Sequence, residues 1–389
     1  MIQLASKNEC MGCMACYNAC PFNAIEIMED QQGFAIPSIN QNKCKECRNC
    51  ERVCPPLNKY NGRVMPQKTF AAWDIVDSER ARSNSGGVAA KLAEYAIKNG
   101  HVVVGAIIDQ DLVVRHRICE TTEELDKLRM SKYVQSEVAN VYKIIKQKLK
   151  ESKKVMFFGT PCQVDAVKRV VGTKYQKLLI TVDLICHGVP SPKYLREHLS
   201  SFEQNLFNVS TYAFRDNNKY SFQVYLKNGE KKVIEYPKDN YLYAFMKNVL
   251  DRESCHGCKY SSIYRVADIT LGDFWGIKDL KTEGVPLEKE KGINAVLINT
   301  DKGYQVFKAI SSELFVEERQ LEEVVEYNPF LREIEKSNED RFLFRKRYSL
   351  EGFEHAVRWL RKRYIGHEAV IWIKNKWDRI MCRVNKVFR

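Results

Sequence analysis

The fold of the first part of the chain is decided by two cysteine runs, Cys10-Met11-Gly12-Cys13-Met14-Ala15-Cys16-Tyr17-Asn18-Ala19-Cys20-Pro21 and Cys44-Lys45-Glu46-Cys47-Arg48-Asn49-Cys50-Glu51-Arg52-Val53-Cys54-Pro55. Both follow the pattern C-x-x-C-x-x-C-x-x-x-C-P. Two residues between ligands let one tight loop place three sulfur atoms at three corners of a cubane, while the fourth cysteine of each run crosses to the other cluster. The spacing therefore predicts two 4Fe-4S clusters, one held by Cys10, Cys13, Cys16 and Cys54 and the other by Cys44, Cys47, Cys50 and Cys20.

Zinc is the alternative use for closely spaced cysteines. Zinc ribbons and fingers use two C-x-x-C pairs, not three ligands and a crossing fourth, so the spacing favours iron-sulfur clusters. Residues 33–37, Gly33-Phe34-Ala35-Ile36-Pro37, are typical of a small hairpin between the two runs. Because about 60 residues bury little apolar surface, we expect the clusters to hold residues 1–62 folded as a two-cluster ferredoxin domain.

Composition places the chain among folded globular proteins. Its 389 residues leave room for two or three domains, and 44% apolar with 11% aromatic residues excludes disorder as the main state. No apolar run approaches the roughly 20 residues that span a bilayer, and the N-terminus MIQLASKNEC lacks a secretory signal pattern. We therefore expect a cytoplasmic protein whose 14 cysteines serve as metal ligands or redox groups, not as disulfides.

Helices and apolar strands alternate after a linker over residues 56–68, which mixes Pro, Asn and Gly with basic residues. The pattern predicts a helix over 88–98 that follows Ser85-Gly86-Gly87 and ends at Asn99-Gly100. Buried strands are expected over residues 101–108, 155–158 and 178–185. The sequence therefore predicts an α+β ferredoxin domain followed by an α/β domain over residues 69–335.

Four further cysteines lie in turn-rich segments of the α/β domain. Cys162 and Cys186 each follow a predicted strand, at the strand end where open α/β sheets bind ligands. Cys255 and Cys258 form a C-x-x-C pair. A single cysteine at a strand end is often an apolar filler, and a lone C-x-x-C suits zinc or a redox pair as well as a cluster. Together the four would close a third cubane site only if the fold gathers them.

Six motifs in one order carry a resemblance to a known family. They are Ser85-Gly86-Gly87-Val88, Leu128-Arg129-Met130-Ser131-Lys132-Tyr133-Val134-Gln135, Gly159-Thr160-Pro161-Cys162-Gln163, Asp183-Leu184-Ile185-Cys186-His187-Gly188, Cys255-His256-Gly257-Cys258, and Ala267-Asp268 with Gly272-Asp273-Phe274-Trp275-Gly276. From about Thr69 to Arg332 the chain resembles the beta subunit of the coenzyme F(420) hydrogenase and dehydrogenase family. Its bacterial branch, with a two-cluster ferredoxin domain in front, is the most similar and is often associated with polysaccharide biosynthesis.

The resemblance implies a cofactor site. In that family the cysteines that correspond to Cys162, Cys186, Cys255 and Cys258 hold a 4Fe-4S cluster beside an FAD. The residues that the resemblance places at the FAD are Ser85, Gly86, Gly87, Arg129, Ser131, Lys132, Tyr133, Gly159 and Thr160, and the candidate catalytic residues are His187 and Asp273. Many relatives carry glycine where this chain has Met130, so a side chain there would crowd a phosphate held by the backbone.

Each of these assignments has a structural alternative. Two glycines before a helix also form an ordinary turn, and Arg129 and Lys132 are also typical of a solvated surface. Tyr133 and Trp275 would equally fill a core. His187, next to a cluster ligand, would relay a proton to flavin or only cap a turn.

The expected function is that of an iron-sulfur flavoprotein oxidoreductase. Cubane clusters pass single electrons and flavin collects two before it gives up a hydride. The expected partners are a low-potential carrier such as ferredoxin, or a partner oxidoreductase subunit, and a small hydride acceptor, either a deazaflavin coenzyme or an intermediate of surface-polysaccharide biosynthesis. The alternatives are an electron-transfer subunit without its own substrate and a structural protein whose clusters serve folding only.

The net charge of +13 is concentrated at the C-terminus, where residues 341–389 hold 14 Lys and Arg against 4 acidic residues, or +10. Over residues 336–389 we expect a basic amphipathic helical tail. Its apolar positions are Ile373, Trp377, Ile380, Val384 and Val387, with Lys374, Arg379, Arg383 and Lys386 between them. Such a helix packs on its own protein or on a second copy, or lies peripherally on the inner face of the membrane. No nucleic-acid motif accompanies the charge.

Overall fold

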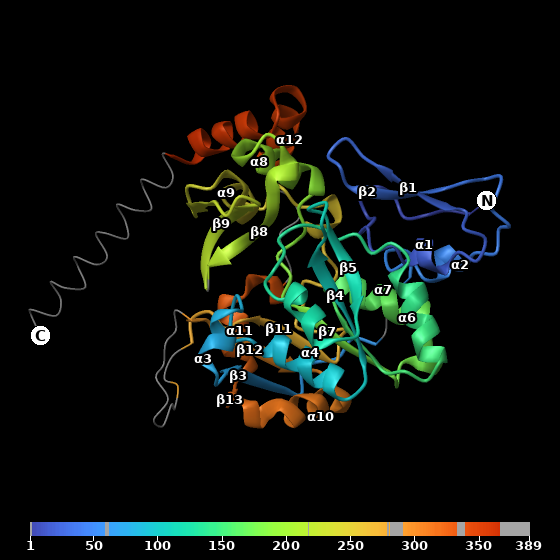
Figure 1. The fold of residues 1–389 in the computed structure, drawn as a ribbon. Helices are drawn as coiled ribbons and strands as arrows, with labels where there is room; N and C mark the ends of the chain where they lie inside the picture. The colour runs from blue at the N-terminus through green and yellow to red at the C-terminus, as the bar shows by residue number, and fades with distance from the viewer. Residues whose placement is uncertain are drawn as a thin grey trace, which may run out of the picture.

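The computed structural model describes residues 2–58, 62–216, 218–277, 280, 291–332 and 339–365. Figure 1 shows an N-terminal lobe (blue) beside a large sheet with helices on both faces, and a smaller layer that carries α12 above the sheet. Helices and strands are mixed throughout, which confirms the predicted α+β and α/β class.

The N-terminal lobe is built from two short helices and one hairpin. Helices α1 (Ala15–Ala19) and α2 (Asn49–Arg52) each lie inside one cysteine run, and strands β1 (Ile25–Glu29) and β2 (Ala35–Ile39) pair antiparallel between them. Met14 and Arg48 stand at equivalent positions of the two runs, and both have the left-handed φ of 58°. The repeated spacing therefore gives a repeated backbone.

The central sheet is mixed, with the strand order β13-β3-β12-β11-β7-β6-β4-β5. Its strands are β3 (Lys68–Asp74), β4 (Val102–Ile108), β5 (Val114–Cys119), β6 (Val155–Phe158), β7 (Leu179–Leu184), β11 (Ile269–Asp273), β12 (Asn294–Ile298) and β13 (Leu314–Arg319). The neighbours β4, β6, β7 and β11 run parallel, and the outer pairs are antiparallel. The carboxyl ends of the four parallel strands therefore meet at one edge.

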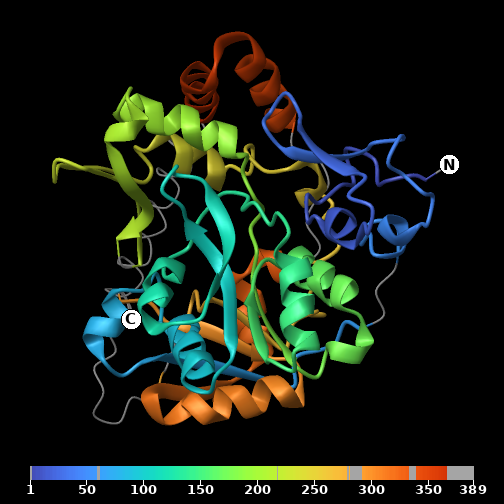
Figure 2. The same ribbon diagram turned by 45° about the vertical axis from the view of Figure 1, so that its right-hand side comes forward.

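Alternating residues of the parallel strands face two different helical layers. Val103 packs with α4 (Val88–Lys98) and α10 (Asp301–Ile310), whereas Val102 and Val104 pack with α6 (Val141–Lys150) and α7 (Pro161–Val171). Such strands are buried on both faces, as parallel strands usually are. Figure 2 shows α10 (orange) at the bottom of the view and α6 and α7 (green) next to the N-terminal lobe (blue). The remaining helices beside the sheet are α3 (Asp77–Ala81), α5 (Thr122–Leu125) and α11 (Leu321–Tyr327).

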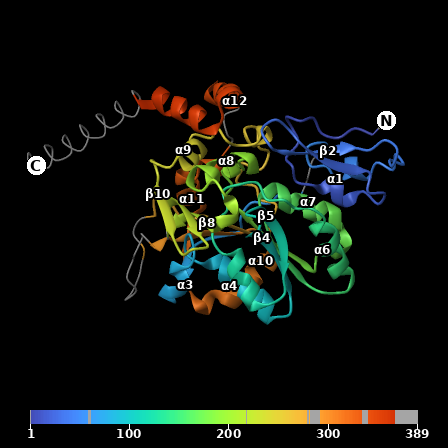
Figure 3. The same cartoon turned by 45° about the horizontal axis from the view of Figure 1, so that its top comes forward.

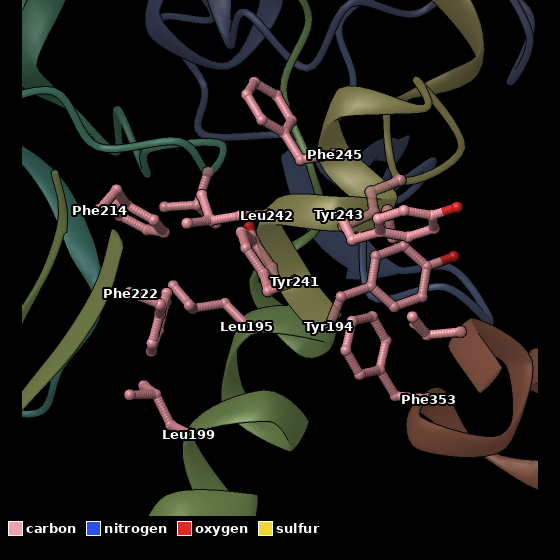
Figure 4. Close-up of a cluster of buried hydrophobic side chains, with 14 of the residues drawn as sticks. Tyr194, Leu195, Leu199, Phe214, Phe222, Tyr241, Leu242, Tyr243, Phe245 and Phe353 are labelled. Carbon is pink, nitrogen blue, oxygen red and sulfur yellow. The ribbon is translucent and has the colours of Figure 1, made fainter. Parts of the chain in front are cut away.

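A second layer, which the sequence did not predict, lies between β7 and β11 in the chain. It contains α8 (Pro192–Phe202), α9 (Asn240–Met246) and a three-stranded antiparallel sheet of β8 (Val209–Asp216), β9 (Lys219–Leu226) and β10 (Lys231–Glu235). Its core is aromatic: Tyr194, Phe214, Phe222, Tyr241 and Phe353 are all buried (Figure 4). The layer stands over the same edge of the central sheet at which the parallel strands end (Figure 1).

The C-terminal helices complete this aromatic layer. Phe344 and Tyr348 of α12 (Glu339–Glu351) and Phe353 of the helical residues 353–365 lie in the same core as Tyr194 of α8. Residues before and after the predicted domain boundary at 335–336 therefore pack in the same core, and Figure 3 shows α12 next to α8 and α9. The apolar and basic positions predicted for residues 373–387 lie outside the described residues. Within the described ranges, no helix has the length and apolarity to cross a membrane.

The N-terminal lobe is docked on the central domain through α1, which lies beside α6 and α7 (Figures 1 and 3). Asn18 of α1 is 4% exposed; its Nδ2 donates to the Ala139 carbonyl at 2.8 Å, and its Oδ1 accepts from the Lys143 amide at 3.1 Å. On the other side, Arg252 donates to the Ala35 carbonyl and its guanidinium lies 5.0 Å from the Phe34 ring centroid. A buried polar side chain paired in this way fixes the orientation of the lobe.

A buried histidine in the aromatic layer makes a pH-dependent prediction. His198 Nε2 lies 2.8 Å from Oδ2 of Asp239, and Nδ1 lies 3.6 Å from Glu354. Burial lowers the pKa of His198, but the hydrogen bond to Asp239 and the nearby carboxylate of Glu354 outweigh burial and raise it above its ordinary value. The protonated ring therefore adds stability below about pH 6.5, and that stability is lost as the pH rises through the raised pKa.

We expect the unfolding free energy of the parent protein, minus that of His198→Gln, to be largest near pH 6 and to decrease toward pH 9. Denaturant titrations at several pH values measure this difference. The exposed His355→Gln is the control, because its side chain lies outside the aromatic core. A difference that stays constant with pH would contradict the prediction.

Candidate functional site

The cysteines of the N-terminal lobe surround two separate hollows. Cys10, Cys13, Cys16 and Cys54 line one, together with Pro37 and Pro55, and Cys20, Cys44, Cys47 and Cys50 line the other. This is the grouping that the spacing predicts, including the exchange of the fourth cysteine between runs. All these thiols are free of disulfides. The lobe therefore brings each predicted set of four around its own space.

The hollows suit a cluster better than a single ion. Among the described residues, no three His, Cys, Asp or Glu side chains converge on a point that one metal ion would occupy. A zinc ion draws its thiolates to about 2.3 Å from one centre, whereas a cubane spreads its four ligands over four corners. The donor sets consequently fit 4Fe-4S clusters.

A third group of cysteines forms in the central domain. Cys162 stands in the first turn of α7 directly after β6, Cys186 follows β7, and Cys255 and Cys258 lie in and after the turn over Glu253–Cys255. Burial raises the pKa of Cys186, and the nearby thiols of Cys162 and Cys258 raise it further. Burial likewise raises the pKa of Cys255, with Asp251, Cys258 and Cys186 adding to the rise. Cys186 and Cys258 therefore lie near each other and near both Cys162 and Cys255, although the four thiols come from three distant segments.

The first and third groups adjoin each other. Cys13 packs in the same apolar cluster as Cys162 and Cys258, whereas Cys16, Cys20 and Cys50 pack in a separate cluster within the lobe. Burial raises the pKa of Cys13, and Cys162 is among the thiols that raise it further. The three groups thus form a row, with the Cys44 group at the outer end and the Cys162 group at the inner end.

Two arginines of α12 fix the loop that carries Cys255. Arg341 Nη1 donates to Glu253 Oε1 at 3.1 Å and Arg345 Nη1 donates to Glu253 Oε2 at 2.6 Å. Arg345 also donates to the Asp251 carbonyl at 2.8 Å. Helix α12 therefore holds a loop that is almost 90 residues earlier in the chain.

A cavity of about 320 Å³ opens next to the third group, at the carboxyl ends of β6, β7 and β11. Cys186 is part of its wall, so the cavity touches the third group directly. The place and size are those of a ligand site in an α/β protein, since such pockets measure roughly 300–1,000 Å³. The cavity lies between the central sheet and the aromatic layer, which contributes Arg215, Tyr220 and Phe245.

The cavity wall carries buried polar atoms that have no hydrogen-bond partner among the described residues. They are Asn84 Nδ2 and Oδ1, Ser85 Oγ, Arg129 Nη1 and Arg215 Nε. An unpaired buried donor or acceptor costs about 1–3 kcal/mol. Such atoms point to a polar or anionic ligand that completes the hydrogen bonds, and the donor set suits the phosphates and ring edges of a flavin nucleotide.

Every residue that the family resemblance placed at the FAD lines this cavity except Gly86. Gly86 lies beneath the cavity wall. A Cβ at this position would meet the Ala72 carbonyl oxygen and would lie 2.8 Å from the Asn294 amide nitrogen. Next to it, the Val88 amide at the start of α4 already donates to Asn294 Oδ1 at 3.1 Å. Gly86 therefore permits close packing of α4 on the sheet and does not face the cavity.

Lys132 and Arg129, the two cations expected near a phosphate, both make contacts within the protein. Lys132 Nζ donates to the carbonyls of residues 127, 128 and 129 at 3.1, 3.0 and 2.6 Å, so it holds the turn before it. Arg129 pairs with Glu79 at 2.5 Å, Glu94 at 3.2 Å and Asp126 at 3.2 Å. Only Nη1 of Arg129 remains for a ligand. Compared with Arg129 and Lys132, Arg215 is better placed to bind an anionic group of a ligand in the cavity.

Met130 occupies a backbone position that favours glycine. Its φ is 67°, in the left-handed region, which costs a residue with a side chain roughly 1–2 kcal/mol. The side chain is 37% exposed and lines the cavity. A glycine at this position would therefore avoid a conformational cost that Met130 carries.

His187 and Asp273, the candidate catalytic residues, both lie on the cavity wall. The His187 ring stacks on Phe330 with centroids 4.1 Å apart, and burial lowers its pKa to about 4, so it is neutral at neutral pH. Asp273 accepts from Arg215 Nη2 at 2.7 Å. A neutral imidazole accepts or donates one proton, while the paired Asp273 carboxylate chiefly holds Arg215.

Two cavity residues have no signal in the sequence. Arg215 donates to Tyr220 Oη at 2.5 Å as well as to Asp273, and its guanidinium lies 4.2 Å from the Tyr220 ring centroid. His116 lies 3.1 Å from the Phe158 carbonyl and 2.9 Å from Ser136 Oγ. Each belongs to a strand without a recognisable motif, so only the fold brings them to the site.

The close approach at Gly86 gives a stability prediction. We expect Gly86→Ala to lower the free energy of unfolding by about 2 kcal/mol, because the added methyl group pushes on the backbone of β3 and β12. In Gly100→Ala the added Cβ has open space, and the only cost is that alanine must adopt the left-handed backbone of Gly100. The free energy of unfolding should therefore fall by about 1 kcal/mol. Chemical denaturation of both variants checks the order. Equal losses would mean that the packing at Gly86 has no special cost.

The fold and the cysteine groups define an iron-sulfur protein of the oxidoreductase or electron-transfer class. Comparison with known proteins makes this more specific. Residues 152–324 match the family model for the C-terminal part of the coenzyme F420 hydrogenase/dehydrogenase beta subunit, and residues 9–57 match the 4Fe-4S dicluster domain. These matches confirm the resemblance: residues 152–324 are similar to this beta subunit, and a dicluster domain lies in front of them.

Two individual proteins are also similar to parts of the chain. An uncharacterized polyferredoxin-like protein of Methanocaldococcus jannaschii is 37% identical over 60 residues, 13% of this chain, and the match spans 36% of that relative's length. A chain from the F420-reducing [NiFe] hydrogenase complex of Methanosarcina barkeri aligns with 79% of this chain and 95% of its own, at 21% identity and a TM-score of 0.45.

Proposed function

We propose that the chain is an iron-sulfur flavoprotein oxidoreductase that exchanges single electrons with a low-potential carrier and hydride with a small molecule. The proposal assigns two clusters to residues 1–62 and a third cluster with FAD to residues 69–335. The observation that supports it is the row of three cysteine groups, which begins at the surface of the lobe and ends at the wall of a ligand-sized cavity.

The residues of the chain have distinct tasks in this proposal. Cys162, Cys186, Cys255 and Cys258 bind the third cluster. Asn84, Ser85, Arg129 Nη1 and Arg215 Nε bind polar groups of the flavin, because they are buried and unpaired. Bound flavin supplies the conversion between single electrons and a hydride. Neutral His187 is the candidate for proton transfer at the cavity wall, and the substrate is a deazaflavin coenzyme or an intermediate of polysaccharide biosynthesis.

The experiment that tests the proposal is anaerobic purification followed by iron, sulfide and flavin analysis. Three cubanes give about twelve Fe per chain, and one flavin is expected with them. Eight Fe would remove the third cluster. Reduction with dithionite should then bleach both the clusters and the flavin.

The alternative is an electron-transfer subunit that serves another enzyme, and the family name supports it because it describes a beta subunit. In that case a partner oxidoreductase subunit would copurify in fixed stoichiometry, and the isolated chain would reduce no small molecule. Turnover of a hydride acceptor by the isolated chain would favour the first proposal.

A further inference from the structure

The outer cysteine group reaches the surface of the lobe. Cys47 is exposed and Cys44 is half-buried, whereas Cys10, Cys13, Cys16 and Cys54 of the inner group are all buried. The hollow of the outer group is also lined by Phe22, Lys45 and Arg48. We call Phe22, Lys45, Cys47 and Arg48 the outer face.

The outer face is locally basic although the lobe as a whole is not. Residues 2–58 hold five Lys or Arg, and four of them, Lys43, Lys45, Arg48 and Arg52, fall within residues 43–52 beside only two acids. Lys43 is 3.6 Å from Glu26 and Arg48 is 3.8 Å from Glu51, both long contacts between partly exposed groups. Exposed pairs of this kind neutralise little of the field. The acidic residues Glu29 and Asp30 lie on the hairpin instead.

An apolar side chain lines the same hollow as two of these basic residues. Phe22 is 45% exposed and lines the same hollow as Lys45 and Arg48. An exposed aromatic side chain that shares a hollow with basic side chains has the composition of a transient docking site, with an apolar centre and a polar rim. The face also lies at the end of the row of cysteine groups that is farthest from the cavity.

We propose that the outer face docks a small acidic one-electron carrier protein. This inference rests on the proposed function. The carrier is oxidised by one electron and the cluster of the outer group is reduced by one, with no atom transferred. Lys45 and Arg48 attract the acidic carrier, and Phe22 makes the short-range contact that excludes water over Cys47.

Titration calorimetry of the anaerobic full-length protein with an acidic ferredoxin tests the surface. We expect Lys45→Glu with Arg48→Glu to weaken binding about tenfold at low ionic strength and to have little effect at high salt, because the contribution is long-range and screened. Phe22→Ala should weaken binding similarly at both salt concentrations. Lys98→Glu with Lys227→Glu, two exposed lysines far along the chain, changes the net charge equally and serves as the control.

The outcomes separate the docking surface from the function. Iron analysis shows whether each variant keeps its clusters, and Lys45→Gln with Arg48→Gln, expected to weaken binding by less, replaces the charge reversal if that variant loses iron. Carrier affinity that is unchanged by these substitutions, or that falls equally in the control, overturns the proposed surface. Failure of dithionite-reduced clusters to pass electrons to the flavin would overturn the proposed function instead, whatever the carrier affinity.

Discussion

Replacing Cys255 by serine is expected to lower the iron content of the anaerobically purified protein by about four atoms per chain, the content of one cubane. Cys255 belongs to the third group, where Cys186 and Cys258 are its neighbours. Serine keeps the size of the side chain but replaces the thiolate ligand. The cluster spectra of the N-terminal lobe should persist, while reduced clusters no longer reduce the flavin. Iron analysis and flavin bleaching after dithionite measure the two effects.

The chain offers a matched control for this substitution. Cys119, at the end of β5, is 2% exposed, and its nearest polar contact is the Glu124 carbonyl at 3.9 Å. Cys119→Ser should therefore leave the iron content unchanged. If Cys255→Ser keeps all its iron, the ligand set proposed for the third cluster is wrong, and the N-terminal dicluster domain alone remains.

Replacing Arg215 by glutamine is expected to lower the free energy of unfolding by about 3 kcal/mol, the cost of leaving one partner of a buried ion pair alone. The side chain of Arg215 is 4% exposed and that of Asp273 is 17% exposed, so solvent screens the pair only slightly. The substitution also removes hydrogen bonds to the Asn84 carbonyl and the Tyr220 hydroxyl. Denaturant unfolding of the flavin-free protein measures the loss.

The same substitution separates a ligand role from a structural one. If Arg215 Nε binds the flavin, the dissociation constant for flavin rises in Arg215→Gln beyond what lower stability explains, and Arg215→Lys does not restore it, because lysine lacks the planar fork. Arg117→Gln is the control: Arg117 pairs with Asp109 but is 47% exposed, so at most about 1 kcal/mol is expected. Unchanged flavin affinity would limit Arg215 to a structural role.

Much of the central domain could be predicted from local pattern. The helix expected over 88–98 is α4 with the same bounds, and the strand expected over 155–158 is β6 with the same bounds. Both are short elements bounded by glycine or by a change in polarity, signals that act within a few residues. The grouping of the N-terminal cysteines around two hollows could also be predicted, because each run supplies three of the four cysteines of one group.

The aromatic layer could not be predicted in this way. Its core joins Tyr194 of α8 to Phe353, which lies about 160 residues later, and no local periodicity shows that contact. The place of Arg215 in the site could not be predicted for the same reason, because its partner Asp273 is 58 residues away on another sheet. Lys132 shows what charge alone does not predict: the residue lines the cavity as expected, but its ammonium group donates to three carbonyls of the preceding turn.

The contact of α12 with Glu253 has a consequence for biosynthesis. Arg341 and Arg345 emerge from the ribosome after every cysteine of the third group, so the loop of Cys255 and Cys258 lacks its guanidinium partners until α12 has been synthesised. We expect that loop to stay accessible to iron-sulfur assembly proteins during synthesis and to close over the proposed cluster site only after α12 has folded against it. Maturation would then follow the order of the chain, with the N-terminal lobe loaded first.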